Sequence, residues 1–490
     1  MSFFSSRRGF MKGAGTVGAA SLLAHKGLAY GVTPFRKNPT VGDLACAPLE
    51  TVNVGIIGLG MRGPGAVYRL SAIPGTKITA LADIYKDRVD RPTKWLTDRG
   101  FAAPKGYSGS TEIWKKLVED PNVNLVYVTS SWQEHVNMVM YAMECGKHVV
   151  CEVPMVFSVE DCWRIVNKAE EKRVHCMLLE NCCYGQNEMT ALNMARQGIL
   201  GTLVHGEGAY IHDLRGLQFA NGSYENYWRL KWNAQHTGNP YATHGLGPIC
   251  QYMNVGHGDQ MKYLTSVSSG CFGFPEYAAA EKARLEQIIA REKKNNLTGR
   301  YGMTVEQALK GPWKQGDMNT TVIKTEMGRT IMVQHDTTSP RPYSRLNLIS
   351  GTKGILKDYP LEVALAPNAH GWLRGKARED LLAKYNHPLW KESGKLAQKM
   401  GGHGGMDFLM DLRLSYCLQN GLPLDINVYD SCQWSVISEL SEISAINEGA
   451  PVEVPDFTRG AWKTIKPLGI ESVKFDFEGK KMNAGKQLNV

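Results

Sequence analysis

The sequence has 490 residues, of which 43% are hydrophobic, and this length fits one large or two ordinary globular domains. The formal net charge of +9 is modest and is not gathered into runs of Lys and Arg, so nucleic acid is not expected as a partner. Eleven cysteines are scattered without metal-ligand spacing, and no segment after the N-terminus is apolar enough to span a membrane, so neither a metal site nor a stable span is predicted.

The N-terminus carries a twin-arginine pattern, Ser6-Arg7-Arg8-Gly9-Phe10-Met11-Lys12, followed by a weakly apolar stretch over 13–24 and small residues up to Ala29. We therefore predict that residues 1–29 are a twin-arginine (Tat) signal peptide. The partner would be the Tat export machinery, and the location would be the periplasm, the cell surface or the medium. A basic, disordered N-terminus is the alternative.

Removal of this segment would take away Arg7, Arg8, Lys12 and Lys26 and no acidic residue, which lowers the formal charge from +9 to +5. Because the twin-arginine route carries folded proteins, a cofactor could be loaded before export. Residues 30–50 contain three prolines and are expected to form a linker.

A glycine-rich turn follows the first predicted strand. An apolar run over 54–57 leads into Gly58-Leu59-Gly60-Met61-Arg62-Gly63, and a helical pattern begins near residue 66. Strand, turn and helix in this order are typical of a dinucleotide-binding site. Its glycines allow a tight turn, close approach of the backbone to a pyrophosphate and close packing of the helix on the strand, and the helix N-terminus faces the phosphates.

Asp83 ends the next apolar run, which covers 77–82. A carboxylate at this place accepts hydrogen bonds from ribose hydroxyls and would repel a 2′-phosphate, so the site is predicted to bind NAD(H) rather than NADP(H). The alternative is a purely structural glycine turn beside a solvated Asp83.

Strands and helices then alternate as far as residue 180. Strands are expected at 123–128, 148–153 and 174–179, and helices at 111–119, 136–145 and 158–172, the last opened by a capping box that begins at Ser158. This alternation predicts a Rossmann domain over 51–180. Ligands of such sheets bind beyond the carboxyl ends of the strands, which nominates as cofactor neighbours Trp132, Gln133, Glu134, His135, Glu152, Val153 and Asn181. For His135 and Asn181 the alternative is a turn residue.

The second half has a different pattern, with β-rich runs at 203–210, 319–325, 329–336 and 346–351. We expect an α+β domain over 181–465 built on a largely antiparallel sheet, followed by a tail over 466–490. An amphipathic helix is predicted over 430–447, with Trp434 in the core. His403 lies between two glycine pairs and is expected to be a flexible loop residue, with a place in the site as the alternative.

The glycine turn, Asp83, the strand that ends at Glu152 and the β-rich second domain resemble the Gfo/Idh/MocA oxidoreductase superfamily. Dehydrogenases of that superfamily typically carry Glu-Lys-Pro at the strand end and an Asp-x-Gly-x-His pattern. Here the corresponding runs are Glu152-Val153-Pro154 and Thr243-His244-Gly245-Leu246-Gly247. A dehydrogenase without these acid–base residues would lose roughly 10²–10⁴-fold in rate per group.

The replacements resemble glycoside hydrolase family 109, the NAD-dependent α-N-acetylgalactosaminidases. The residues that carry the resemblance are Met61-Arg62, Trp132 to His135, Glu152-Val153, Glu180-Asn181, Tyr227-Trp228-Arg229, the run from Tyr241 to Pro248, and the run from Arg341 to Arg345. The run Val255-Gly256-His257-Gly258-Asp259 departs from it, because an Asn-Arg-Gly-Asp-like run is expected there.

The resemblance implies a tightly bound NAD that is regenerated in each turnover, and a glycan or glycoside substrate with terminal α-N-acetylgalactosamine. It places NAD contacts on Met61, Arg62, Asp83, Trp132 to His135, Glu152, Val153, Asn181 and Tyr241. It places substrate contacts on Tyr210, Arg229, Tyr241, Ala242, Thr243, His244 and Tyr343. A homo-oligomer is also possible by resemblance.

NAD⁺ permits a route to hydrolysis that needs no pair of carboxylates. Oxidation at C3 of the sugar acidifies the proton at C2, whose loss expels the C1 substituent; water then adds at C1 and C3 is reduced. By resemblance the configuration is retained. His244 is the predicted acid/base, since histidine has an unperturbed pKa of about 6.5, which suits proton transfer. The alternative is that His244 is a core or capping histidine.

A tyrosine base requires nearby positive charge, which Arg229 or the nicotinamide cation could supply. Tyr241 is the first candidate, and Tyr184, Tyr210 and Tyr343 stay open. Two other functions also stay open: an exported sugar oxidoreductase of the same superfamily with tightly held cofactor, and a non-enzymatic NAD- or sugar-binding protein.

Overall fold

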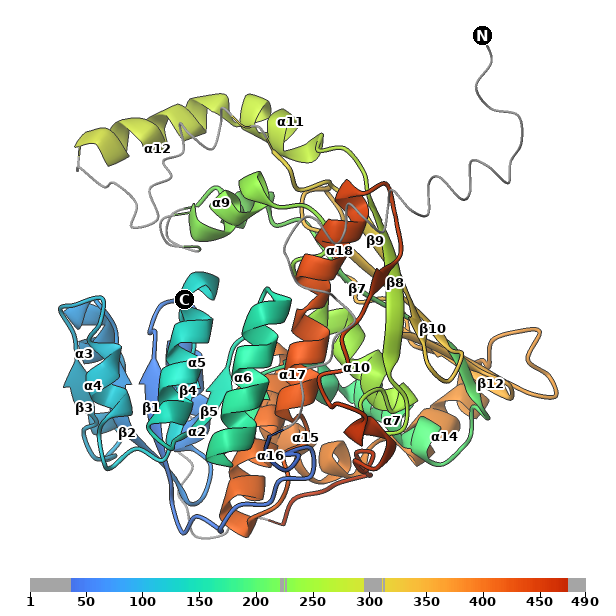
Figure 1. The fold of residues 1–490 in the computed structure, drawn as a ribbon, viewed down its shortest axis with the longest axis horizontal. Coiled ribbons are helices and arrows are strands. Elements are labelled where there is room, and N and C mark those ends of the chain that lie inside the picture. The colour runs from blue at the N-terminus through green and yellow to red at the C-terminus, as the bar shows by residue number, and fades with distance from the viewer. Residues whose placement is uncertain (1–36, 221–223, 225–226, 295–310, 312, 475–490) are drawn as a thin grey trace.

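The computed structural model describes residues 37–474, apart from 221–223, 225–226, 295–310 and 312. The predicted signal peptide and residues 475–490 of the predicted tail lie outside the described residues. Two sheets of different construction make up the fold (Figure 1).

The first sheet has six parallel strands in the order β3-β2-β1-β4-β5-β6. Their bounds are Val52–Ile57 for β1, Thr76–Ala82 for β2, Lys105–Tyr107 for β3, Leu125–Val128 for β4, His148–Cys151 for β5 and Cys176–Leu178 for β6. This is the strand order of a Rossmann fold, and it confirms the predicted class. Successive strands are added toward one edge from β1 to β3 and toward the other edge from β4 to β6. Open sheets of this kind bind their ligands at the point between β1 and β4 where this order reverses.

Helices from both ends of the chain cover this sheet. The crossover helices are α2 (Gly63–Ser71), α3 (Lys86–Thr97), α4 (Trp114–Val118), α5 (His135–Glu144) and α6 (Val159–Lys172). Ser158 is the N-cap of α6, as predicted: its Oγ accepts the Asp161 N–H at 3.1 Å. Two helices from the second half of the chain also pack on this domain. Helix α16 (Met406–Asn420) packs against α2 and β1, and helix α17 (Val428–Ser435) packs against β6 and α6.

The second sheet has the order β13-β12-β11-β7-β10-β9-β8-β14. The strand bounds are Leu203–Ile211 for β7, Met261–Ser268 for β8, Asn319–Thr325 for β9, Thr330–Asp336 for β10, Leu348–Gly351 for β11, Gly354–Lys357 for β12, Glu362–Leu365 for β13 and Val452–Glu453 for β14. Among its strand pairs β7 with β10 is parallel and the others are antiparallel, so the prediction of a largely antiparallel sheet is confirmed. Helices α10 (Thr243–Met253) and α18 (Ile437–Ile446) pack against this sheet.

The helix predicted over 430–447 is two helices, because α17 ends at Ser435 and α18 begins at Ile437. Trp434 lies in the core as expected, but every residue of α17 is buried, so the amphipathic pattern holds only in α18, where Ile437, Leu440 and Ser444 are buried and Ile446 is exposed. The reason is its position, since α17 packs between α6 and β6 on one side and α10 on another.

A smaller hydrophobic cluster lies apart from the main core and is formed by Phe219, Tyr227, Leu230, Phe274, Ala278 and Leu285. It joins α9 (Trp228–Gln235) to α11 (Gly273–Ala280) and α12 (Lys282–Lys294), which extend over the N-terminal domain in Figure 1. The remaining helices are α7 (Gln186–Arg196), α8 (Arg215–Gln218), α14 (Gly375–Tyr385) and α15 (Pro388–Met400), with single turns η1 (Trp132–Glu134), η2 (Asn181–Tyr184), η4 (His403–Gly405) and η5 (Ala461–Lys463).

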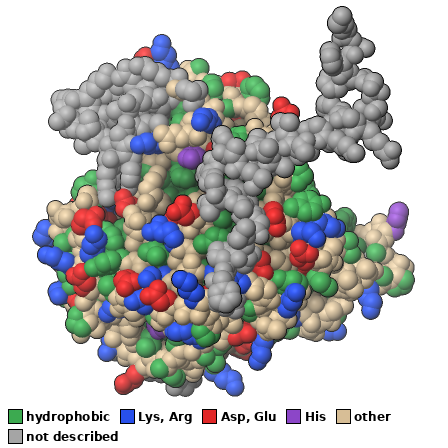
Figure 2. Space-filling view, in the orientation of Figure 1, with side chains coloured by type: hydrophobic (Ala, Val, Ile, Leu, Met, Phe, Trp, Pro, Cys, Tyr) green, Lys and Arg blue, Asp and Glu red, His purple; other side chains and the backbone are tan. Residues whose placement is uncertain are grey.

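Among the described residues, no helix combines the length and the apolar character that a membrane crossing requires. On the face shown in Figure 2, Lys and Arg side chains are interspersed with Asp and Glu side chains.

Candidate active site

Two connected cavities lie beyond the carboxyl ends of the first sheet. The outer cavity, of about 170 Å³, lies at the glycine turn and is lined by residues that include Gly58, Gly60, Asp83, Arg88, Ser131 and Glu134. The inner cavity, of about 350 Å³, extends toward β7 and α10 and is lined by residues that include Glu152, Tyr210, Arg229, Tyr241, His244 and Tyr343. Both are lined by Met61, Arg62, Thr129, Ser130, Tyr224 and Trp228, so a long ligand can occupy the two together.

The glycine turn has the shape of a phosphate cradle. Gly58 has φ = 88° and its missing Cβ would lie 2.8 Å from the Thr129 carbonyl oxygen, so no side chain fits there. A Cβ on Gly63 would lie 2.1 Å from the Gly58 carbonyl oxygen, which keeps α2 close to β1. A Cβ on Gly60 would meet only the Arg88 Nη1 atom, at 3.8 Å, so the backbone at this position is open toward the cavity. These features fit a bound pyrophosphate.

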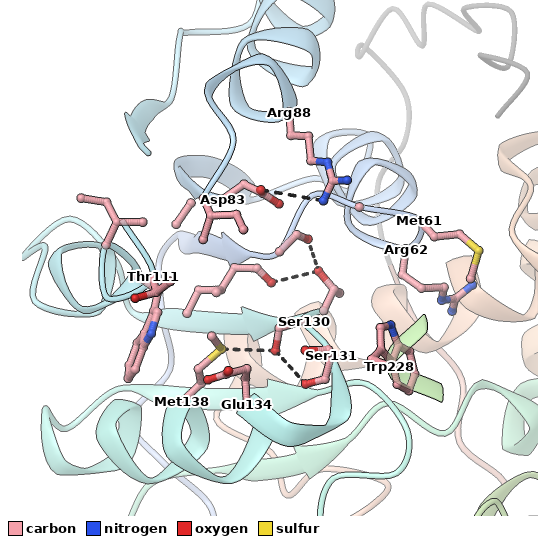
Figure 3. A pocket seen from close by; sticks show the side chains of 18 of the residues that line it. Met61, Arg62, Asp83, Arg88, Thr111, Ser130, Ser131, Glu134, Met138 and Trp228 are labelled. Atoms are coloured by element: carbon pink, nitrogen blue, oxygen red, sulfur yellow. Dashed lines mark hydrogen bonds and ion pairs between the residues drawn. The ribbon is translucent and has the colours of Figure 1, made fainter. Parts of the chain in front are cut away.

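Asp83 lies at the end of β2, on the wall of the outer cavity (Figure 3). Its Oδ2 accepts the Leu59 N–H at 2.7 Å and its Oδ1 accepts the Tyr85 N–H at 3.0 Å. The Arg88 Nη1 atom lies 4.0 Å from Asp83 Oδ1. The carboxylate is therefore tied to the glycine turn at the place where a ribose would bind.

A buried ion network holds Arg62 at the junction of the two cavities. Arg62 Nε donates to Glu152 Oε1 at 2.8 Å, and its Nη1 lies 3.2 Å from Asp407 Oδ2. Burial alone would raise the pKa of the Asp407 carboxyl, but Arg62 and Arg69 hold it well below its usual range. Arg69 Nε also donates to Asp411 at 2.7 Å. Helix α16 thus anchors the glycine turn through Asp407 and helix α2 through Asp411, two carboxylates spaced four residues apart on one helix face.

His244 reaches the inner cavity from the first turn of α10, where α10 touches β7 backbone to backbone. A Cβ on Gly245 would lie 2.1 Å from the Ala209 nitrogen, and only glycine allows this approach. The contact brings the ring centroids of His244 and Tyr210 to 5.3 Å. His244 Nδ1 lies 2.7 Å from Oε1 of the fully buried Glu180.

This pairing makes Glu180 an anion. Burial alone would raise the pKa of the Glu180 carboxyl, but His244 and the Cys182 N–H, which donates to the same Oε1 at 3.1 Å, bring it below its ordinary value. Because an ionised carboxylate only accepts hydrogen bonds, the Nδ1 of His244 carries the proton and its Nε2 is free to accept one.

Arg229 is a buried cation without a carboxylate partner among the described residues. Its guanidinium carbon lies between 4.9 and 5.6 Å from the ring centroids of Trp132, Tyr210, Tyr224 and Tyr241. Nη1 donates to the Tyr224 hydroxyl at 3.0 Å, and Nη2 has no hydrogen-bond partner in the described structure. The positive charge is held by aromatic faces and directed at whatever binds in the cavity.

Three tyrosines that line the inner cavity, Tyr210, Tyr241 and Tyr343, are protonated at neutral pH. Burial raises the pKa of Tyr210 and Tyr241 well above the ordinary value, and Arg229 lowers it by less. Tyr343, which is 38% exposed at the rim, also has a raised pKa because of partial burial of its side chain. Tyr184 donates to Asp425 at 3.1 Å and lines a separate small cavity with Cys183, so it lies outside the candidate site.

The structure brings most of the nominated residues to these cavities. Four lie elsewhere: Gly63 packs on Gly58, Gln133 is exposed, and Ala242 and Thr243 are buried at the start of α10. The His135 nitrogens face the carbonyl oxygens of Pro154 and Ser130, at 2.9 and 3.0 Å, so this ring joins the ends of β4 and β5 as well as lining the cavity.

His403 was expected to be a flexible loop residue, with a place in the site as the alternative, and the structure supports the alternative. It lies in η4, lines the inner cavity, and its Nδ1 is 3.0 Å from Asp407 Oδ2 and 3.2 Å from Arg62 Nη1. Glu180, Asp407 and Arg88 were not nominated. The i, i+4 spacing of Asp407 and Asp411 was a usable signal for a shared helix face, whereas nothing in the sequence links Glu180 to His244, 64 positions away.

Both halves of the chain match known protein families. Residues 184–464 match a family described as "Glycosyl hydrolase 109, C-terminal domain", and residues 52–179 match "Oxidoreductase family, NAD-binding Rossmann fold". The chain is 45% identical over 424 residues to an alpha-N-acetylgalactosaminidase of Bacteroides fragilis, covering 86% of this chain and 95% of that protein. It is 42% identical over 472 residues to a glycosyl hydrolase family 109 protein of Shewanella pealeana, covering 95% and 99%.

Among solved structures, the fold is similar to a levoglucosan dehydrogenase in complex with NADH and levoglucosan. The TM-score is 0.60 at 18% identity, and the match covers 83% of this chain and all of that one. At this identity the similarity shows the fold alone.

Proposed function

The chain belongs to glycosyl hydrolase family 109, and we propose that it hydrolyses terminal α-linked N-acetylgalactosamine, with a tightly held NAD⁺ that is regenerated in each turnover. The B. fragilis relative named for this activity supports the choice of sugar. The proposed cycle is oxidation at C3, elimination, addition of water at C1 and reduction, with retention of configuration.

The chemistry of the inner cavity carries this proposal. Most glycosidases need two carboxylates that flank the scissile bond. Among the described residues that line the inner cavity, Glu152 is the one carboxylate, and it is engaged by Arg62. The polar groups of the lining instead include four histidines, four tyrosines and Arg229, which has no carboxylate partner among the described residues. Such groups suit proton transfer and stabilisation of an anion.

The cofactor would be held by the glycine turn, Asp83 and the Arg62–Glu152 pair. When bound, NAD⁺ supplies a reversible hydride acceptor. Val153 stands where related dehydrogenases carry a lysine, and its carbonyl accepts from Trp132 Nε1 at 3.2 Å, so this position fixes the cavity wall and offers no proton.

His244 is the proton carrier in this proposal. Its free Nε2 accepts a proton from a substrate hydroxyl, and Glu180 stabilises the imidazolium that results. Arg229 stabilises negative charge that develops on the oxidised sugar as its C2 proton leaves. Tyr210 and Tyr241 flank Arg229. Tyr241 gives its proton to the leaving oxygen as it takes up the C2 proton; when water adds at C1, it returns a proton to C2 and takes one from the water.

Export belongs to the same proposal. The twin-arginine segment within residues 1–29 would deliver the protein with its cofactor already bound, because free NAD is scarce outside the cytoplasm. Fractionation of cells that express the full chain or an Arg7→Lys, Arg8→Lys variant tests this: only the first should reach the periplasm.

The test of the activity uses purified protein and a chromogenic α-N-acetylgalactosaminide without added NAD. We expect release of the chromophore with no net NADH, and deuterium from the solvent at C2 of the product. Accumulation of NADH in step with loss of substrate would instead identify a sugar oxidoreductase, and a product without deuterium at C2 would exclude the elimination route.

A further inference from the structure

Three metal-ligating side chains meet at the base of the inner cavity. Glu180 and Cys182 lie at the start of η2, His244 comes from α10, and their ligand atoms all lie within 4.8 Å of one another. Cys182 and His244 line the cavity. The sequence gives no metal-binding spacing, because the third residue comes from α10, a distant element that packs on η2; a Cβ on Gly247 of α10 would lie 3.0 Å from Glu180 Cγ.

A second observation points to a ligand at this place. Glu180 is fully buried and its Oε2 has no hydrogen-bond partner in the described structure, while Oε1 accepts from both His244 and the Cys182 N–H. A buried carboxylate oxygen without a partner is costly, and a bound cation would satisfy it.

We propose that Glu180, Cys182 and His244 form an inhibitory site for a thiophilic divalent cation such as Zn²⁺. Carboxylate, thiolate and imidazole are the ligand types that Zn²⁺ accepts, and three protein ligands leave a fourth position open to the cavity. Tetrahedral ligands of zinc lie about 3.5 Å apart, so side-chain movements of about 1 Å close the site. Mg²⁺ and Ca²⁺ prefer oxygen ligands and are not expected to bind.

Binding of the cation releases a proton from the protein and leaves the site without net charge. The thiol of Cys182 is neutral because burial raises its pKa well above the ordinary value, so its proton is released to solvent as the sulfur–metal bond forms. The thiolate and the Glu180 carboxylate together neutralise the two charges of the cation. The metal also engages the ring of His244, which removes that ring from proton transfer.

The experiment titrates the purified full-length protein with Cd²⁺, whose bond to a thiolate gives an ultraviolet charge-transfer band, and counts bound metal by equilibrium dialysis. The variants are Cys182→Ser and Cys183→Ser. Cys183 is the matched control, since it is the adjacent buried cysteine but lines a different cavity. The readout is the metal itself and does not depend on the hydrolase assignment.

We expect one Cd²⁺ per chain in the wild type and in Cys183→Ser, with release of protons, and binding that is weaker by about tenfold or more in Cys182→Ser. Absence of the band in the wild type, or an equal band in Cys182→Ser, would overturn the proposal. If Cys182→Ser does not fold, His244→Asn removes another ligand, and undiminished Cd²⁺ binding in that variant would have the same force. Zn²⁺ should then inhibit turnover in proportion to the sites filled.

Discussion

The Nδ1 atom of His244 lies 2.7 Å from Oε1 of Glu180, and this carboxylate is fully buried behind the histidine ring. The contact fixes the tautomer of His244 and directs Nε2 to the cavity. In the proposed mechanism Glu180 would act through His244 as a positioning residue.

Glu180→Gln should reduce kcat by roughly 10²-fold or more, because a neutral amide no longer stabilises the imidazolium. Steady-state kinetics check this, with Glu180→Asp as the conservative variant that keeps the charge and should retain more activity. An unchanged kcat in Glu180→Gln would show that the carboxylate only fills space.

Arg229 should be essential for activity and dispensable for folding. Arg229→Met removes a buried charge that has no carboxylate partner among the described residues, so the melting temperature should stay the same or rise. Turnover should fall by roughly 10²–10³-fold, because the developing anion loses its counter-charge. Thermal unfolding and kcat are measured on the same preparation, and Arg229→Lys, which keeps the charge, should retain more activity. A large fall in melting temperature would mean that the aromatic rings depend on the guanidinium.

Substitutions at two glycines of the same turn, Gly60 and Gly63, should have different effects, one on cofactor binding and the other on stability. Gly60→Ala adds a methyl group that meets only the end of the Arg88 side chain, so unfolding without cofactor should be unaffected, while the NAD content of the purified protein should fall. Gly63→Ala places the same methyl group 2.1 Å from the Gly58 carbonyl oxygen and should lower the melting temperature. The NAD content and the melting temperature of both purified variants test this prediction. Full NAD content in Gly60→Ala would mean that the pyrophosphate lies elsewhere.

The sequence predicted the first domain well because its signals are local. Val54, Gly58 and Asp83 mark a strand, a turn and a strand end, and each follows from neighbours in the chain. The predicted strands β7, β9, β10 and β11 were found for the same reason, whereas the short strands β3, β12, β13 and β14 were missed because they have too few residues to show a period. The eight-residue strand β8 was also missed, because an irregularity between Met261 and Tyr263 interrupts its alternation of buried and exposed residues.

What could not be predicted depends on contacts between distant elements. Asp407 reaches Arg62 across 345 positions, and Glu180 reaches His244 across 64. The placement of His403 in the site follows from its bond to Asp407, which no pattern around two glycine pairs reveals. A glycine such as Gly245 is a recognisable signal for close approach of two backbones. The sequence does not show that the backbone it approaches is β7, which only the structure reveals.

His257 occupies the run that departs from the family pattern, and it forms a cationic pair outside both cavities. Its Nδ1 lies 2.7 Å from the Lys466 carbonyl oxygen and its Nε2 lies 3.0 Å from Asp430 Oδ1. Both partners are acceptors, so both ring nitrogens carry protons. Burial lowers the pKa of His257, but Asp430 and these hydrogen bonds raise it above the ordinary value.

A raised pKa in the folded state means that the pair stabilises the protein fully below about pH 6.5, and that this contribution is lost as the pH rises through the folded pKa. We expect the difference in free energy of unfolding between wild type and His257→Gln to be about 1–3 kcal/mol at pH 6 and to shrink toward pH 9. Urea denaturation at a series of pH values measures it. His236→Gln is the control, because that histidine pairs with Glu442 in a more exposed position, where an ion pair contributes little. A difference that does not change with pH would mean that His257 contributes through packing and not through its charge.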